Sequence, residues 1–176
     1  IPEGKADLII SVEPMEALRY LPMLAKDGVI ITAKAPFINI DNYPEVEAVY
    51  TELKKHNAVI IDADELAKEC GNVRAANMVI FGAAVPFLGF EMETIENSIR
   101  EQIGSKVEEV VALNLKAVEA GCHHNQNRCL FRPTDAQFAR GESLHLSLVG
   151  SKDSHQGTET GTPFRVVVMT CPMIVR

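Results

Sequence analysis

The chain has 176 residues, of which 47% are hydrophobic and 23% are charged, and its formal charge is −7. This length is typical of one domain with a small appendage, and the apolar share is sufficient for a full core. The acidic balance excludes a typical nucleic-acid-binding protein, which needs a basic face. No apolar run reaches the roughly 18 residues of a membrane-spanning helix, so we expect no nucleic acid and no membrane as partners.

The cysteines and the N-terminal residues indicate the cellular compartment that we expect for the protein. Cys70, Cys122, Cys129 and Cys171 form no CxxC pair and no spacing typical of a disulfide framework. The N-terminus lacks a basic stretch followed by an apolar run, as a secretion signal would have. We therefore expect reduced thiols in a cytoplasmic protein.

The first sixty residues alternate between strand and helix patterns. The apolar run 7–12 predicts a strand, and a helix over 14–26 follows at once, which Pro22 should kink or split and Asp27-Gly28 should end. The β-branched run 29–33 predicts a second strand that is covered on both faces, as in a parallel sheet.

The next segments continue this alternation. After a loop at 39–42, the pattern predicts a helix over 44–56, a strand over 58–63 and a short helix that Asp64 caps and Gly71 ends. Residues 75–88 are apolar on all sides, which predicts a buried helix. Gly82 inside it indicates close packing against a neighbour, because glycine costs about 1 kcal/mol relative to alanine there. Two amphipathic helices are expected over 93–103 and 107–120.

This order indicates an α/β fold, with a three-layer open parallel sheet of Rossmann-like type. We expect the strands at 7–12, 29–33 and 58–62 to be parallel neighbours. Three strands would leave one edge long and apolar, so we expect further strands upstream of Ile1, that is, an N-terminally truncated domain.

The composition changes at Gly121. Twenty of the 24 acidic residues lie at or before this position, whereas four of the five histidines follow it. We therefore predict a domain over 1–121 and an irregular C-terminal extension over 122–176, disordered or non-native, with no packing role in the sheet. Within it, 143–149 alternates like a short strand, 164–169 is apolar and 151–163 is typical of loop or disorder.

Three charged residues near the first two strands are candidates for ligand binding. Glu13 lies where a strand meets a helix, which is the position that faces the crevice in an open α/β sheet, although it could instead be a solvated acid beside the helix N-terminus. Arg19 could pair with Glu16 on the surface, or approach a phosphate-bearing ligand such as coenzyme A together with Lys34.

The remaining candidates lie later in the chain. Arg74 and Asn77 open the apolar helix, where they could meet an anion or cap the helix. Cys122, His123 and Cys129, with the adjacent His124, contain zinc-ligand types, but their spacing is not that of a structural zinc site, so we predict no metal site. We predict no catalytic residues, because the chain has no Ser–His–Asp arrangement, phosphate loop or GxGxxG motif.

Several segments, in order, resemble one family. They are Ala6 to Pro22 (ADLIISVEPMEALRYLP), Pro36 to Pro44 (PFINIDNYP), Asp62 to Ala67 (DADELA), Asn72 to Val79 (NVRAANMV), Gly82, and Asn114 to Gly121 (NLKAVEAG). Over about residues 2–121 the chain is similar to the gamma subunits or domains of 2-oxoacid:ferredoxin oxidoreductases, and in particular to the small (beta) subunits of indolepyruvate:ferredoxin oxidoreductases. It departs from the family in lacking the Gly-rich strand–turn–helix at the start and in running on after the closing helix.

The resemblance implies an oxidative decarboxylation in which an arylpyruvate such as indolepyruvate and coenzyme A give an acyl-CoA, carbon dioxide and reduced ferredoxin. It implies that thiamine diphosphate and [4Fe–4S] clusters belong to a large alpha subunit, with ferredoxin as a further partner of the complex. The chain itself would then bind no cofactor, except that Glu13, Arg19, Lys34 and Asn77 would line a ligand crevice or subunit interface.

Two other functions stay open on the sequence. The chain could be a stand-alone Rossmann-like module that binds a nucleotide or coenzyme A, which a dinucleotide fingerprint upstream would favour. It could also be a non-catalytic α/β scaffold whose apolar edge docks a partner.

Overall fold

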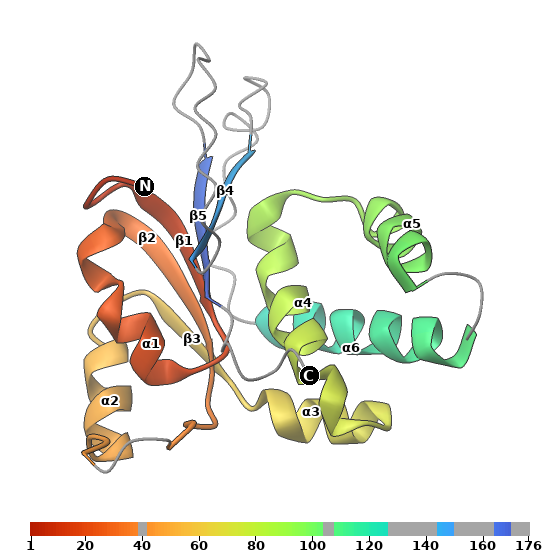
Figure 1. Ribbon diagram of the computed structural model, residues 1–176, viewed down its shortest axis with the longest axis horizontal. Coiled ribbons are helices and arrows are strands. Elements are labelled where there is room, and N and C mark those ends of the chain that lie inside the picture. Colours follow the sequence, from red (N-terminus) through yellow and green to blue (C-terminus); the bar gives the residue numbers. More distant parts are fainter. Residues whose placement is uncertain (39–41, 104–107, 127–143, 150–163, 170–176) are drawn as a thin grey trace. The chain divides into compact units, whose positions relative to one another are not determined.

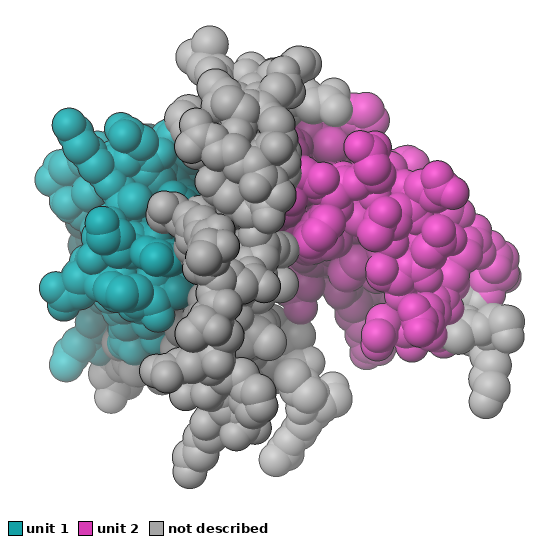
Figure 2. All heavy atoms as spheres, turned by 90° about the horizontal axis from the view of Figure 1, so that it is seen from above, with its two compact units in different colours: residues 1–60, 133–176 teal, residues 61–132 magenta. Residues whose placement is uncertain are grey.

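The computed structural model describes residues 1–38, 42–103, 108–126, 144–149 and 164–169. Two compact units divide the chain: residues 1–60 with 133–176 form unit 1, and residues 61–132 form unit 2 (Figure 2).

The sheet contains the strands β1 (Ala6–Ser11), β2 (Leu24–Ala33), β3 (Ala58–Ile61), β4 (Leu144–Val149) and β5 (Phe164–Met169). Their order is β3-β2-β1-β5-β4, as Figure 1 shows. The pairs β1/β2, β1/β5 and β4/β5 are parallel. The α/β class and the open parallel sheet are therefore confirmed, and β3 lies beside β2 as the sequence predicts.

Two helices, α1 (Pro14–Arg19) and α2 (Val46–Leu53), pack on the sheet within unit 1. Ile9 of β1, Ile30 of β2 and Val167 of β5 are fully buried in one cluster with Ala17, Val49 and Leu53 of these helices. Burial of each large aliphatic side chain stabilises the fold by about 1.5–3 kcal/mol. The alternate positions Leu8, Ile10 and Ile31 are buried as well, so the β-branched runs form strands that are buried on both faces.

The expected helix over 14–26 is too long. The helix α1 ends at Arg19, the 3-10 turn η1 (Leu21–Met23) contains Pro22, and β2 begins at Leu24. Proline has no N–H to continue the helical pattern, so the chain leaves the helix instead of kinking within it.

Asp27-Gly28 does not end a helix either, because both residues lie inside β2. The β1/β2 register shifts between Ala6 and Leu8, and a Cβ on Gly28 would lie 2.8 Å from the carbonyl oxygen of Ala6. Gly28 therefore marks a strand irregularity where two backbones approach closely.

The cap of the third helix also differs from the expectation. The strand β3 ends at Ile61, and the Asp62 carboxylate accepts the N–H of Glu65 at 3.3 Å to cap α3 (Ala63–Cys70). Asp64 lies in the first turn instead, where its negative charge favours the helix N-terminus. Gly71 ends the helix with φ 118°, as predicted.

Part of the C-terminal segment belongs to the sheet. The strand β5 pairs with β1, its Val166 and Val167 are fully buried, and the Asp7 carboxylate accepts the N–H of Arg165 at 2.8 Å. The expectation that the tail has no packing role is therefore wrong for 164–169. The expected loop over 151–163 lies outside the described residues.

Unit 2 is helical. After η2 (Val73–Ala75), it contains α4 (Ala76–Leu88), α5 (Met92–Ile103) and α6 (Glu108–Gln126), so the expected domain boundary at Gly121 falls inside a helix. The apolar helix α4 is buried along most of its length, as predicted.

The helices α4 and α6 meet at two glycines. A Cβ on Gly82 would lie 2.0 Å from the Val118 carbonyl oxygen, and one on Gly121 would lie 1.9 Å from the Val79 carbonyl oxygen. The close packing inferred for Gly82 is confirmed. Among the helices that the structure describes, none is long and apolar enough to cross a membrane.

Candidate functional site

The carboxyl ends of β1 and β2 lie side by side. Ser11 pairs in register with Thr32 on one side and with Met169 on the other. The strand order reverses at β1, because β2 and β3 lie on one side and β5 and β4 on the other. Open α/β sheets bind ligands outside the carboxyl ends of the strands at such a point. The segment that follows Ser11 is therefore the candidate site.

Glu13 lies in that segment and is a buried residue, at 5% exposure. Its Oε2 accepts the N–H of Glu16 at 2.7 Å, which caps α1, and its Oε1 accepts the O–H of Tyr43 at 2.5 Å. The Ser11 hydroxyl donates to the Glu13 carbonyl at 2.7 Å and accepts from the Glu13 N–H at 3.2 Å. The junction position is confirmed, but Glu13 is not a solvated acid.

Tyr43 completes this cluster, although its part in the site was not predicted from the sequence. Burial, followed by the hydrogen bond and the negative charge of Glu13, raises the pKa of its phenol well above the usual range. The phenol therefore stays protonated at neutral pH and acts as a donor. The sequence signal was weak, because Tyr43 follows Glu13 by thirty positions and lies in the segment before α2.

Arg19 and Lys34 are the other candidates in unit 1. Arg19 Nη1 lies 3.1 Å from Glu16 Oε1, with the two side chains 55% and 40% exposed. Arg19 therefore forms the surface ion pair with Glu16 that was considered from the sequence, and such a pair stabilises the fold by less than about 1 kcal/mol. Lys34 is exposed directly after β2, and its carbonyl accepts the O–H of Tyr50 at 2.5 Å.

Asn77 lies in unit 2, in the first turn of α4, and is exposed. The side chain that caps this region is that of Asn72, whose Oδ1 accepts the N–H of Arg74 at 2.9 Å. Glu13, Arg19 and Lys34 thus belong to one unit and Asn77 to the other.

The zinc-ligand types assessed in the sequence lie around the end of α6. Cys122, His123 and His124 belong to that helix, whereas Cys129 lies outside the described residues. Within the described ranges, no three His, Cys, Asp or Glu side chains gather to hold a metal ion.

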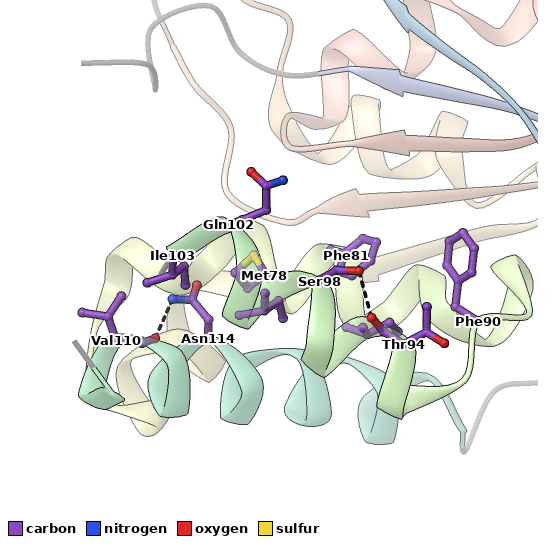
Figure 3. Close-up of a pocket in the computed structure, with 11 residues that line it drawn as sticks. Met78, Phe81, Phe90, Thr94, Ser98, Gln102, Ile103, Val110 and Asn114 are labelled. Atoms are coloured by element: carbon purple, nitrogen blue, oxygen red, sulfur yellow. Dashed lines mark hydrogen bonds between the residues drawn. The ribbon is translucent and has the colours of Figure 1, made fainter. Parts of the chain in front are cut away.

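Unit 2 contains a pocket that sequence reasoning missed. It has a volume of about 570 Å³ and lies between α4, α5 and α6 (Figure 3). Its lining is predominantly apolar and consists of Met78, Phe81, Phe90, Thr94, Ile95, Ser98, Ile99, Gln102, Ile103, Val110 and Asn114. The amphipathic pattern of residues 93–103 predicted the helix α5. It did not predict that α5 would leave a space between itself and the helices α4 and α6.

Comparisons with known proteins agree with this fold. The sequence profile described as "Pyruvate ferredoxin/flavodoxin oxidoreductase" matches residues 1–123. Proteins named "Indolepyruvate oxidoreductase subunit IorB" are 37% identical over 131 residues in Archaeoglobus fulgidus and 36% identical over 132 residues in Pyrococcus horikoshii. Each alignment covers 69% of this chain and 64% of the relative, so the chain spans less than two thirds of the length of these relatives.

A solved structure shares the fold. The pyruvate oxidoreductase subunit PORC from Thermotoga maritima superposes with a TM-score of 0.50 at 20% identity, over 68% of this chain and 64% of that chain. At this identity the likeness concerns the fold alone.

Proposed function

Because the chain belongs to the pyruvate ferredoxin/flavodoxin oxidoreductase family, we propose that it is the small, non-cofactor subunit of a cytoplasmic 2-oxoacid:ferredoxin oxidoreductase that acts on an arylpyruvate such as indolepyruvate. The assembled enzyme would convert the 2-oxoacid and coenzyme A to an acyl-CoA and carbon dioxide, with ferredoxin as the electron acceptor. The observation that carries this proposal is the 32–37% identity to proteins named as subunits of indolepyruvate oxidoreductase.

Thiamine diphosphate and [4Fe–4S] clusters would belong to a large partner subunit. The four cysteines of this chain do not have the spacing of a ferredoxin-type run, so its own residues do not fit a cluster site. The cofactors would supply the bond-breaking chemistry and electron transfer, and this chain would help to bind, orient or enclose the substrates.

The carboxyl edge of the sheet is the proposed ligand crevice or subunit interface. Lys34 supplies an exposed cation after β2, and Phe37 and Ile38 follow with 43% and 64% exposure, as interface residues often do. Both Glu13 oxygens already accept protein hydrogen bonds, so Glu13 would act by positioning Tyr43 and the start of α1. Arg19 and Asn77 stay candidates for contacts to coenzyme A or the partner.

The test is to co-purify this chain with the large subunit and to measure ferredoxin reduction with indolepyruvate and coenzyme A. Lys34→Ala should raise the KM for coenzyme A about tenfold, because it removes a charge-assisted contact worth about 1.4 kcal/mol. Lys26→Ala is the matched control, since Lys26 is an exposed lysine in the first half of β2, whereas Lys34 follows the end of that strand.

The two parts of the proposal fail differently. Absence of a complex with the large subunit, or oxidation of indolepyruvate by this chain alone, would contradict the subunit role. An active complex in which Lys34→Ala and Lys26→Ala have the same KM would contradict only the coenzyme A contact.

A further inference from the structure

The pocket of unit 2 is an open apolar groove that runs beside α5. Phe90 and Val110 lie at its two ends in Figure 3, and each is 39% exposed. The twelve residues of α5 (Met92–Ile103) span about 18 Å, which matches about three turns of a second helix. Exposed aromatic and branched side chains around a concave apolar surface are typical of an interaction site.

Two of the polar side chains in the lining donate to carbonyls of their own helices. The Ser98 hydroxyl donates to the Thr94 carbonyl at 2.8 Å, and Asn114 Nδ2 donates to the Val110 carbonyl at 2.7 Å (dashed lines in Figure 3). No charged side chain lines the groove within the described residues. A phosphate or carboxylate ligand would therefore find no cation there, whereas apolar side chains would be buried well.

Two exposed glutamates adjoin lining residues of the groove in the sequence, since Glu91 follows Phe90 and Glu101 precedes Gln102. Glu91 lies just before α5, and its carbonyl accepts the N–H of Ile95 at 3.2 Å. Helical periodicity therefore places Glu91 and Glu101 on the same side as Thr94 and Ser98, from which we infer an acidic rim. The basic residue of this helix, Arg100, lies on the other side.

Arg100 is also occupied. Its guanidinium contacts Glu96 at 2.9 Å and Glu108 at 2.8 Å. The groove side of α5 therefore presents negative charge beside an apolar floor.

We propose that this groove receives an amphipathic helix of the partner subunit, with apolar side chains at i, i+3 or i+4 and i+7 in the groove and Lys or Arg beside Glu91 and Glu101. The inference rests on the proposed subunit role, and it adds where the partner binds and which chemistry it presents.

The first test uses the assembled complex with the photo-reactive residue p-benzoylphenylalanine in place of Ser98, an exposed residue of the lining. Mass spectrometry should find a cross-link to a partner segment with helical apolar spacing and flanking Lys or Arg. The same residue in place of Val73, which is 46% exposed and outside the groove, should not label that segment. A cross-link to a second copy of this chain, to this chain itself or to nothing would overturn the proposal.

The second test reverses the rim charge. Glu91→Lys with Glu101→Lys should weaken the affinity for the partner about tenfold at low salt, and the effect should shrink at high salt. The matched control is Glu93→Lys with Glu119→Lys, which makes the same charge change at exposed positions outside the lining.

Equal affinities for the two double variants would overturn the groove assignment while the complex and its activity persist. A wild-type chain that forms no complex would instead contradict the proposed function.

Discussion

The sheet core of unit 1 and the helix pair of unit 2 reach full burial in opposite ways. In unit 1, branched side chains such as Ile9, Ile30 and Val167 fill the space between the strands and α1 and α2. In unit 2, the backbones of α4 and α6 meet directly at Gly82 and Gly121. The core of unit 1 is therefore stabilised by large side chains, whereas the contact between α4 and α6 requires residues without a Cβ. Removing side-chain atoms should destabilise unit 1, and adding them at the glycines should destabilise unit 2.

The largest effect is expected for removal of atoms from unit 1. Ile30 is fully buried in β2, and Ile30→Ala should lower the free energy of unfolding by about 2–5 kcal/mol, since it leaves a cavity. Urea denaturation followed by circular dichroism measures the change. Ile30→Val is the graded control and should lower the free energy by about 1 kcal/mol. Equal, small losses for both variants would mean that this core repacks freely.

Addition of a single methyl group should be nearly as harmful in unit 2. In Gly82→Ala, the new Cβ would have to displace the backbone of α6 at Val118, and we expect a loss of about 3 kcal/mol despite the better helix propensity of alanine. Thermal unfolding measures it. Gly4→Ala is the control, because a Cβ there meets nothing within 4 Å and only its φ of 66° is unfavourable, which costs about 1 kcal/mol. A stable Gly82→Ala variant would contradict the direct backbone contact.

The smallest effect concerns the polar edge of unit 1 and its dependence on pH. The folded-state pKa of Tyr43 is raised, so the stability that its phenol contributes is fully present below the ordinary tyrosine pKa of about 10 and is lost as the pH rises through the higher folded value. Tyr43→Phe should therefore cost about 1 kcal/mol at pH 7. Above pH 10 this difference from the wild type should shrink, and denaturation curves at several pH values measure it. A difference that stays constant to pH 11 would show that the pKa of the Tyr43 phenol is not raised in the folded state.

The comparison also separates what local patterns can predict from what they cannot. The runs around Ile9 and Ile30 and the all-apolar helix α4 were predicted, because burial on every side leaves a local signature. Pro22 was recognised as a helix breaker, but the sequence pattern could not decide between a kink and the return of the chain into β2.

Long-range pairings left no such signature. The strand β5 lies beside β1 although Arg165 follows Asp7 by 158 positions, and a short apolar run in a polar tail gives no indication of its partner. The hydrogen bond between Tyr43 and Glu13 likewise joins residues that are far apart in the sequence, and no local pattern predicts it. The sequence therefore predicts that Glu13 lies at the carboxyl edge of the sheet, but it does not predict the hydrogen bonds of the Glu13 carboxylate.

The glycine contact between α4 and α6 has a consequence for motion. Two helices whose backbones touch cannot slide past each other without unfolding, so their amide protons should exchange slowly and together. The helix α5 is fixed mainly through Ile95 and Ile99, its two buried residues, and can open locally at lower free energy. The groove thus has one rigid wall and one compliant wall, which would let it adjust its width to an incoming side chain while the rest of unit 2 stays folded.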